Sequence, residues 1–100
     1  MITFENLVFT NHPNPSGGGV QAKVKFDNGY GASVIKTQTS YGGQNGLYEL
    51  AVLGKDDHIT YDTPVTNDVL GYLSEADVTT ILAQIQSLEN GKEEEPRRNG

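Results

Sequence analysis

The sequence contains no cysteine, so it has neither a disulfide framework nor a thiolate metal site. It also lacks any apolar run approaching the roughly 20 residues that span a bilayer. The first five residues, Met1 to Glu5, have no basic region and carry an acid where a signal peptide is apolar. These absences predict a protein of the reducing cytoplasm that has no membrane partner.

Arginine is scarce, and its position matters. Both arginines, Arg97 and Arg98, lie among the last residues, so residues 1–90 contain only lysine as a strong base. The formal net charge is -6. Because arginine is the usual residue for bidentate contacts to phosphate and guanine, this composition excludes direct binding to nucleic acid.

Catalytic and cofactor motifs are also missing. The three glycines at 17–19 are followed by a strand-like segment and not by the Lys-Ser or Lys-Thr pair of a phosphate loop. None of the serines stands in a nucleophile-elbow pattern. Asp56, Asp57, His58 and Asp62 lack the spaced oxygen ligands of a calcium loop, which favours a solvated turn there. We therefore expect no catalytic residue, no cofactor and no metal.

What the sequence does contain is one domain built around an apolar strand. Leu47 to Leu53, between Gly46 and Gly54, is the most continuously apolar run and predicts a central strand. We expect the domain to cover residues 1–90. The tail at 91–100 has no apolar residue and is predicted to be disordered.

Further strands are predicted around this one. Residues 20–26 alternate between apolar and polar side chains, and Asn28-Gly29 predicts a hairpin that returns along 30–37. Two registers remain open, with Ala22 opposite either Ile35 or Val34. Two other segments have strand-like patterns, namely 2–10, which is interrupted at Asn6, and 58–62.

The C-terminal part of the domain predicts one amphipathic helix. Ser74 and Asp77 form a capping-box pattern, and a single helical turn is expected just before it, at 66–70. Asn90-Gly91 is a typical helix stop. Apolar residues then recur at helical spacing: Val78, Ile81, Leu82, Ile85 and Leu88. The predicted fold is therefore α+β, a four- to five-stranded antiparallel sheet with one C-terminal helix packed on one face.

One helix can cover only one face of such a sheet. The other face, marked by Leu47, Ala51 and Leu53, is therefore predicted to be partly bare and apolar. A bare face indicates a partner surface or a homodimer, unless the N-terminal segment or the loop at 38–46 covers it. Glu49 is the single charge in the central strand. It is either an inward site carboxylate or a residue that faces water on an edge or pairs with a lysine of the neighbouring strand.

Tyrosine is the most frequent aromatic residue, and several tyrosines stand beside glycine. Tyrosine among Gly, Ser and Asn is typical of adaptable recognition surfaces, although tyrosines at strand ends are also commonly half-buried. The candidate partner-binding residues are Tyr30, Tyr41, Gly42, Gly43, Tyr48, Tyr61, Asp56 and Asp57.

Several stretches resemble small uncharacterised accessory proteins of tailed bacteriophages and prophages. The similar sequence segments are NGYG at 28–31, SYGG at 40–43, GLYELAVL at 46–53, YDTPVT at 61–66 and DVLGYL at 68–73. The resemblance covers about residues 20–88 and includes no active-site motif. It implies a non-enzymatic protein in the cytoplasm of an infected bacterium, which binds a host or phage protein as an inhibitor of defence or metabolism.

Two other classes of function remain open. The first is an acidic mimic of nucleic acid, which needs its carboxylates on one face: Asp56, Asp57, Asp62, Asp68, Glu75 and Asp77. The second is a small enzyme or nucleotide-binding protein that uses the glycine-rich loops.

Overall fold

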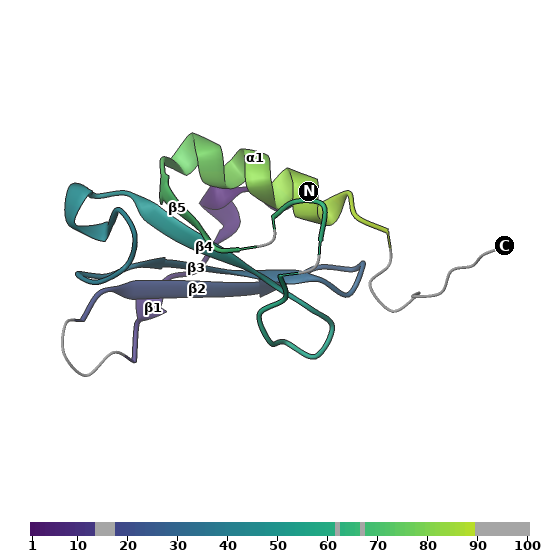
Figure 1. The fold of residues 1–100 in the computed structure, drawn as a ribbon, viewed down its shortest axis with the longest axis horizontal. Coiled ribbons are helices and arrows are strands. Elements are labelled where there is room, and N and C mark those ends of the chain that lie inside the picture. Colours follow the sequence, from purple (N-terminus) through teal and green to yellow (C-terminus); the bar gives the residue numbers. More distant parts are fainter. Residues whose placement is uncertain (14–17, 62, 67, 90–100) are drawn as a thin grey trace, which may run out of the picture.

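The computed structural model describes residues 1–13, 18–61, 63–66 and 68–89. A five-stranded antiparallel sheet, in the order β1-β2-β3-β4-β5, carries one C-terminal helix on one face (Figure 1). The α+β prediction is thus confirmed. The predicted tail at 91–100 and the helix stop at Asn90-Gly91 lie outside the described residues. The strands are β1 (Thr10–Asn11), β2 (Val20–Lys25), β3 (Gly31–Lys36), β4 (Tyr48–Leu53) and β5 (Leu70–Leu73).

The β2–β3 hairpin resolves the register that the sequence left open. Ala22 lies opposite Val34, and the Phe26 N–H donates to the Tyr30 carbonyl oxygen at 2.8 Å, which leaves a three-residue loop at 27–29. Gly29 has φ +92°. A three-residue hairpin loop needs a left-handed residue at this position, and glycine adopts that conformation without steric cost.

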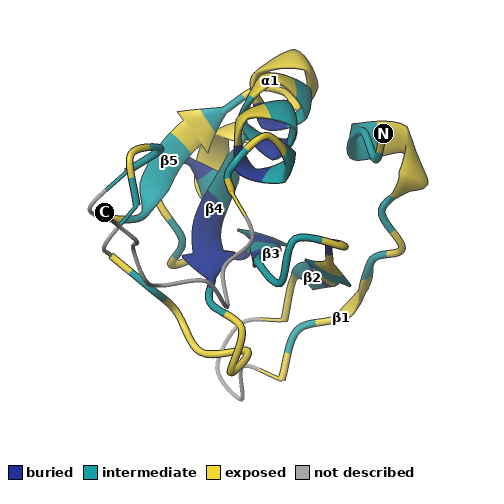
Figure 2. Ribbon diagram, turned by 90° about the vertical axis from the view of Figure 1, so that its right-hand side faces the viewer, coloured by how far each residue is buried: buried dark blue, intermediate teal, exposed yellow. Residues whose placement is uncertain are grey.

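Helix α1 (Glu75–Gln86) begins at the predicted cap. The Ser74 hydroxyl accepts from the Asp77 N–H, and the Asp77 carboxylate accepts from the Ser74 N–H, both at 3.0 Å. Its apolar stripe packs on β3, β4 and the hairpin residue Phe26. Figure 2 shows the buried side of α1 turned toward the sheet. The buried core consists of Phe26, Ala32, Val34, Leu50, Val52, Val78, Leu82 and Ile85.

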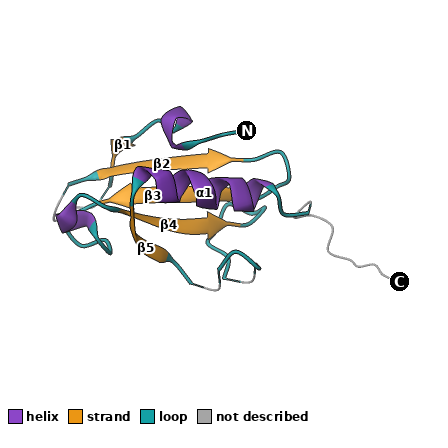
Figure 3. Ribbon diagram, turned by 90° about the horizontal axis from the view of Figure 1, so that it is seen from above, coloured by secondary structure: helices purple, strands orange, loops and turns teal. Residues whose placement is uncertain are grey.

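The strand predicted at 2–10 is wrong, because most of this segment packs beside α1 instead. Residues Phe4–Asn6 form the 3-10 helix η1, which lies next to α1 (Figure 3). Gln86 both accepts from the Ile2 N–H and donates to the Ile2 carbonyl oxygen. Phe4 and Phe9 surround the Tyr48 ring, with centroids 5.1 and 5.7 Å from it. Burying these two rings outweighs pairing along the sheet, so the N-terminal segment covers the same face as α1.

The strand predicted at 58–62 and the helical turn predicted at 66–70 are also wrong. Of the first, Ile59 is the only residue among the described 58–61 that makes a bridge, to Leu53, and the Thr60 N–H donates to the Val52 carbonyl oxygen. Of the second, Leu70 begins β5, which pairs with the other half of β4. Asp62 and Asn67, which belonged to these predictions, lie outside the described residues.

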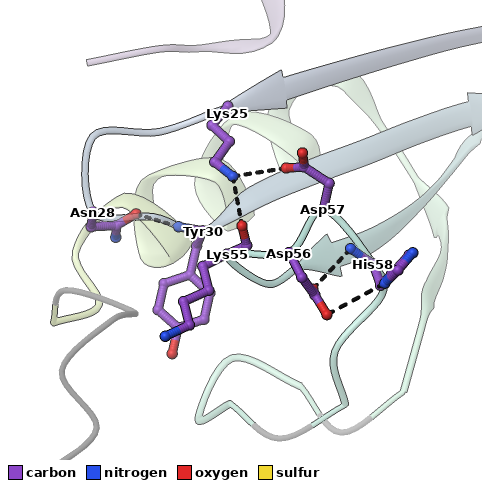
Figure 4. A network of polar contacts seen from close by, with 7 residues as sticks. All are labelled: Lys25, Asn28, Tyr30, Lys55, Asp56, Asp57 and His58. Atoms are coloured by element: carbon purple, nitrogen blue, oxygen red, sulfur yellow. Dashed lines mark hydrogen bonds and ion pairs between the residues drawn. The ribbon is translucent and has the colours of Figure 1, made fainter.

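The face of the sheet opposite α1 is neither bare nor apolar, contrary to the sequence prediction. Ala51 and Leu53 are only 7% and 6% exposed. Lys25 Nζ contacts Asp57 Oδ1 at 2.8 Å and the Lys55 carbonyl oxygen at 3.0 Å, which fastens the turn after β4 to β2 (Figure 4). The other side chains of this face are mostly polar: Gln21, Lys23, Ser33 and Glu49, with Ile35 among them.

Asn28, at the tip of the hairpin, holds the end of α1. Its amide Nδ2 donates to the carbonyl oxygens of Ile85 and Leu88 at 2.8 and 3.1 Å, while its Oδ1 accepts from the Tyr30 N–H. The last carbonyls of a helix have no partner within the helix, so a donor here satisfies groups that are otherwise unpaired.

We expect Asn28→Ala to lower the free energy of unfolding by about 1–3 kcal/mol, because it removes the donor to two half-buried carbonyls. Asn28→Asp should cost at least as much, since it also brings a carboxylate to the negative end of the helix dipole. Urea denaturation measures both. Asp27→Ala, an exposed change in the same turn, should stay within about 0.5 kcal/mol of the unchanged protein. An Asn28→Asp variant of unchanged stability would contradict this role.

Candidate functional site

Strand β5 contains a bulge whose geometry sets it apart from the rest of the sheet. Tyr48 pairs with Leu73 and Leu50 with Leu70, so two residues, Gly71 and Tyr72, lie opposite the single residue between Tyr48 and Leu50. Tyr72 has φ +56°, a left-handed conformation that only one other non-glycine residue of the described chain adopts. This conformation costs a tyrosine of the order of 1–3 kcal/mol, and such strain tends to be retained at functional sites.

The loop at 38–46 is bound to this bulge through the backbone of Tyr41. The Tyr41 N–H donates to Glu49 Oε1 at 2.8 Å, and the Tyr41 carbonyl oxygen accepts from the Tyr72 N–H at 3.1 Å. Glu49 is half-buried, and within the described chain it forms no ion pair with a lysine. It anchors the loop from the strand position opposite the bulge.

Two glycines allow the loop and β5 to approach each other this closely. A Cβ at Gly71 would overlap the Cβ of Tyr41, and a Cβ at Gly42 would lie 2.8 Å from the Tyr72 Cα. Gly42 also has φ +91°. Side chains at either position would push the two segments apart.

The start of the loop is braced from inside by two hydroxyl groups. The Thr37 N–H donates to Ser40 Oγ at 2.9 Å, and the Ser40 N–H donates to Thr37 Oγ1 at 3.0 Å. Thr37 is only 5% exposed. Beyond this turn, Gly43–Asn45 form the short 3-10 helix η2. The loop at 38–46 is thus anchored to the rest of the fold both at its start and at Tyr41.

The result is a pair of exposed tyrosines on a fixed backbone. Tyr41 and Tyr72 are each 60% exposed. Within the described chain neither ring stacks on another aromatic ring. We call Tyr41 and Tyr72, with their supports Gly42, Glu49 and Gly71, the tyrosine surface. Rigidly mounted tyrosines supply contact area at low entropic cost, which suits recognition of a partner.

The structure brings together only some of the residues that the sequence nominated. Tyr41 and Gly42 belong to the tyrosine surface, and Gly43 follows them in η2. Tyr30 and Tyr48 are half-buried against the core, with Lys36 Nζ 5.0 Å from the centroid of the Tyr48 ring. The remaining nominees, Tyr61, Asp56 and Asp57, lie in or just after the turn that follows β4.

Sequence reasoning missed Tyr72 and the role of Gly71. A signal was present, because a glycine inside a short apolar run such as Leu70 to Leu73 indicates a bulge or a close backbone approach. Its significance depended on recognising that run as a strand, where a helical turn was expected instead.

The acidic turn after β4 uses its carboxylates for internal contacts. Asp57 is paired with Lys25, and Asp56 Oδ1 accepts from the His58 N–H at 3.1 Å while Asp56 Oδ2 lies 3.3 Å from His58 Nδ1 (Figure 4). In the residues that the structure describes, no three acidic or histidine side chains gather as metal ligands. Asp62, the fourth member of that sequence hypothesis, lies outside those residues.

The His58 backbone N–H, and to a lesser extent its side chain, hold the pKa of Asp56 below the ordinary value of 3.8. A depressed pKa in the folded state means that this contact stabilises the fold above pH 3.8 and that the stabilisation is lost as the pH falls through the lowered pKa. We expect NMR titration to show the low pKa. It should persist in His58→Ala, which keeps the backbone donor, and disappear in His58→Pro, which removes it. An Asp56 carboxyl that titrates at 3.8 or above would contradict the contact.

A second prediction concerns the backbone of Tyr72. Because φ is positive there, Tyr72→Gly should be more stable than Tyr72→Ala by about 1 kcal/mol, even though glycine ordinarily costs folding entropy. The same pair of changes at Tyr61, which has no positive φ, should give the opposite order. Thermal or urea denaturation of the four variants makes the comparison. Equal stability of Tyr72→Gly and Tyr72→Ala would show that the position is not strained.

Comparison with known proteins adds no assignment, since no family model, curated protein or solved structure matches the chain. No helix among the described residues is long and apolar enough to cross a membrane.

Proposed function

We propose that this chain is a non-enzymatic binding protein that docks on another protein through the tyrosine surface. The observation that carries the proposal is the bulge at Tyr72. Tyr41 and Tyr72 present two exposed rings. Their backbones are held by the left-handed conformation of Tyr72, by the Glu49 carboxylate that anchors Tyr41, and by the close approach at Gly42 and Gly71. Bulges commonly re-aim side chains at functional sites.

The resemblance to phage accessory proteins suggests where the partner is found. We infer a host or phage protein in the cytoplasm of an infected bacterium, with inhibition of host defence or metabolism as the consequence of binding. Self-association has less support, because the bare apolar face that suggested a homodimer is occupied by polar side chains and a fastened turn.

The two other classes of function have weaker support. Three carboxylates of the proposed nucleic-acid mimic are engaged internally: Asp57 with Lys25, Asp56 with His58, and Asp77 in the cap of α1. For an enzyme, a hollow of about 870 Å³ between Val65 and α1 offers no acid or base. Its lining consists of Pro64, Val65, Thr79, Thr80, Ala83, Gln84, Ser87 and Leu88.

Affinity capture from a bacterial lysate tests the proposal. The unchanged protein should retain a discrete partner, and Tyr41→Ala and Tyr72→Ala should each reduce its recovery several-fold because they remove exposed ring area from the contact. Tyr61→Ala is the matched control, since Tyr61 is also exposed, at 51%, but lies outside the tyrosine surface. Retention of the same partner by both Tyr41→Ala and Tyr72→Ala at control levels would rule out this surface.

A further inference from the structure

The chain contains four Asn-Gly pairs, at 28–29, 45–46, 90–91 and 99–100. The last two lie outside the described residues. An asparagine that precedes glycine is especially prone to deamidation, because glycine has no side chain to shield its backbone nitrogen from the asparagine amide. The two described pairs share this sequence but lie in different surroundings, so the structure can distinguish them.

The reaction needs only water and a mobile asparagine side chain. The glycine nitrogen loses its proton to a solvent base and attacks the asparagine Cγ. The bond from Cγ to the side-chain nitrogen breaks, and that nitrogen leaves as ammonia. Water then opens the resulting ring at either carbonyl, which yields aspartate or a β-linked aspartate with one more carbon in the main chain. The side-chain amide must therefore leave its existing partners before it can react.

In both described pairs the attacking nitrogen is held in the same way. The Gly29 N–H donates to the Phe26 carbonyl oxygen, and the Gly46 N–H donates to the Gly43 carbonyl oxygen, each at 3.1 Å. Since the two nitrogens are equally engaged, the asparagine side chains decide which pair reacts.

At the tip of the hairpin the Asn28 side chain is engaged through both of its polar atoms. Nδ2 donates to the carbonyl oxygens of Ile85 and Leu88 at 2.8 and 3.1 Å. Oδ1 accepts from the Tyr30 N–H at 3.0 Å (Figure 4). Ring formation at Asn28 would break all three bonds and release the end of α1, so it requires a local opening of the fold.

Asn45, at the end of η2, has no such restraint. It is exposed, and its side chain forms no hydrogen bond within the described chain. Gly46 is exposed as well, and a Cβ built on it would meet nothing within 4 Å. This end of the loop at 38–46 is therefore open to solvent, and the Asn45 amide can turn toward Gly46 without breaking a contact of its own.

We infer that Asn45-Gly46 is a site of spontaneous deamidation in the folded protein, and that the fold protects Asn28-Gly29 from the same reaction. Because the reaction needs only water, the inference is independent of the proposed partner.

The location of the site gives the reaction a structural consequence. The β-linked product lengthens the main chain between Asn45 and Leu47, and the Leu47 N–H donates to the Gly42 carbonyl oxygen at 2.9 Å. Gly42 belongs to the tyrosine surface. Modification of Asn45 therefore loosens one support of that surface, whereas the same reaction at Asn28 would remove the donor that holds the end of α1.

Incubation of the full chain at mildly alkaline pH, followed by tryptic peptide mapping with mass spectrometry, tests the inference. Lys36 lies between the two sites, so trypsin places them in different peptides. In the folded protein Asn45 should convert at least about tenfold faster than Asn28, because three hydrogen bonds must break before Asn28 can react. In concentrated urea the two should convert at similar rates, since glycine follows both.

Two variants sharpen the comparison. Asn45→Gln, whose longer side chain forms the ring poorly, should abolish conversion in the peptide 37–55 and leave Asn28 unaffected. Ile85→Val, which weakens the packing at the end of α1, should speed conversion of Asn28 about twofold to tenfold and leave Asn45 unchanged. Equal rates at Asn45 and Asn28 in the folded protein, or an Asn45 that converts only in urea, would overturn the inference.

Discussion

The fold depends on burying one strand beneath one helix. β4 supplies Leu50 and Val52, which are almost fully buried against Val78, Leu82 and Ile85 of α1. Each such side chain contributes of the order of 1.5–3 kcal/mol when it leaves water. The positions of the remaining elements follow from the need to complete or protect this layer.

Three segments complete it in different ways. The N-terminal segment closes the side of α1 by placing Phe4 and Phe9 against Tyr48, and Asn28 ties the hairpin to the last turn of the helix. On the opposite face, Lys25 draws the turn after β4 across the sheet. An exposed ion pair of this kind contributes little by itself. Its importance is that it places water-facing groups beside Leu53.

The sequence predicted what depends on local pattern and failed where tertiary contacts decide. The helix, its Ser74 cap and the β2–β3 hairpin follow from spacing, capping chemistry and the Asn28-Gly29 turn, and all three are present. By contrast, residues 2–10 have strand-like alternation, but their aromatic rings find a larger apolar surface beside α1. Leu70 to Leu73 is too short to reveal its conformation. It becomes a strand because β4 leaves an edge free for it.

The candidate site escaped prediction for a related reason. Tyr41 was nominated from composition, but the bulge that exposes Tyr72 was not foreseen, because its left-handed backbone breaks the local preference of a tyrosine. Consistency between local preference and fold is what makes sequence prediction possible, and functional sites are where natural proteins depart from it. The anchoring role of Glu49 likewise depends on a loop that approaches β4 from eight residues upstream.

The same bulge also protects the edge of the sheet, where exposed tyrosines would otherwise lie beside free backbone groups. An edge strand with free backbone groups and exposed aromatic residues invites unwanted pairing with another strand. Here the bulge interrupts β5, and the Tyr41 carbonyl oxygen accepts a hydrogen bond from the Tyr72 N–H. At the opposite edge, β2 extends beyond β1 and carries Lys23 and Lys25, charges that discourage strand addition. Tyr41 and Tyr72 are therefore exposed on backbones that these hydrogen bonds hold in place.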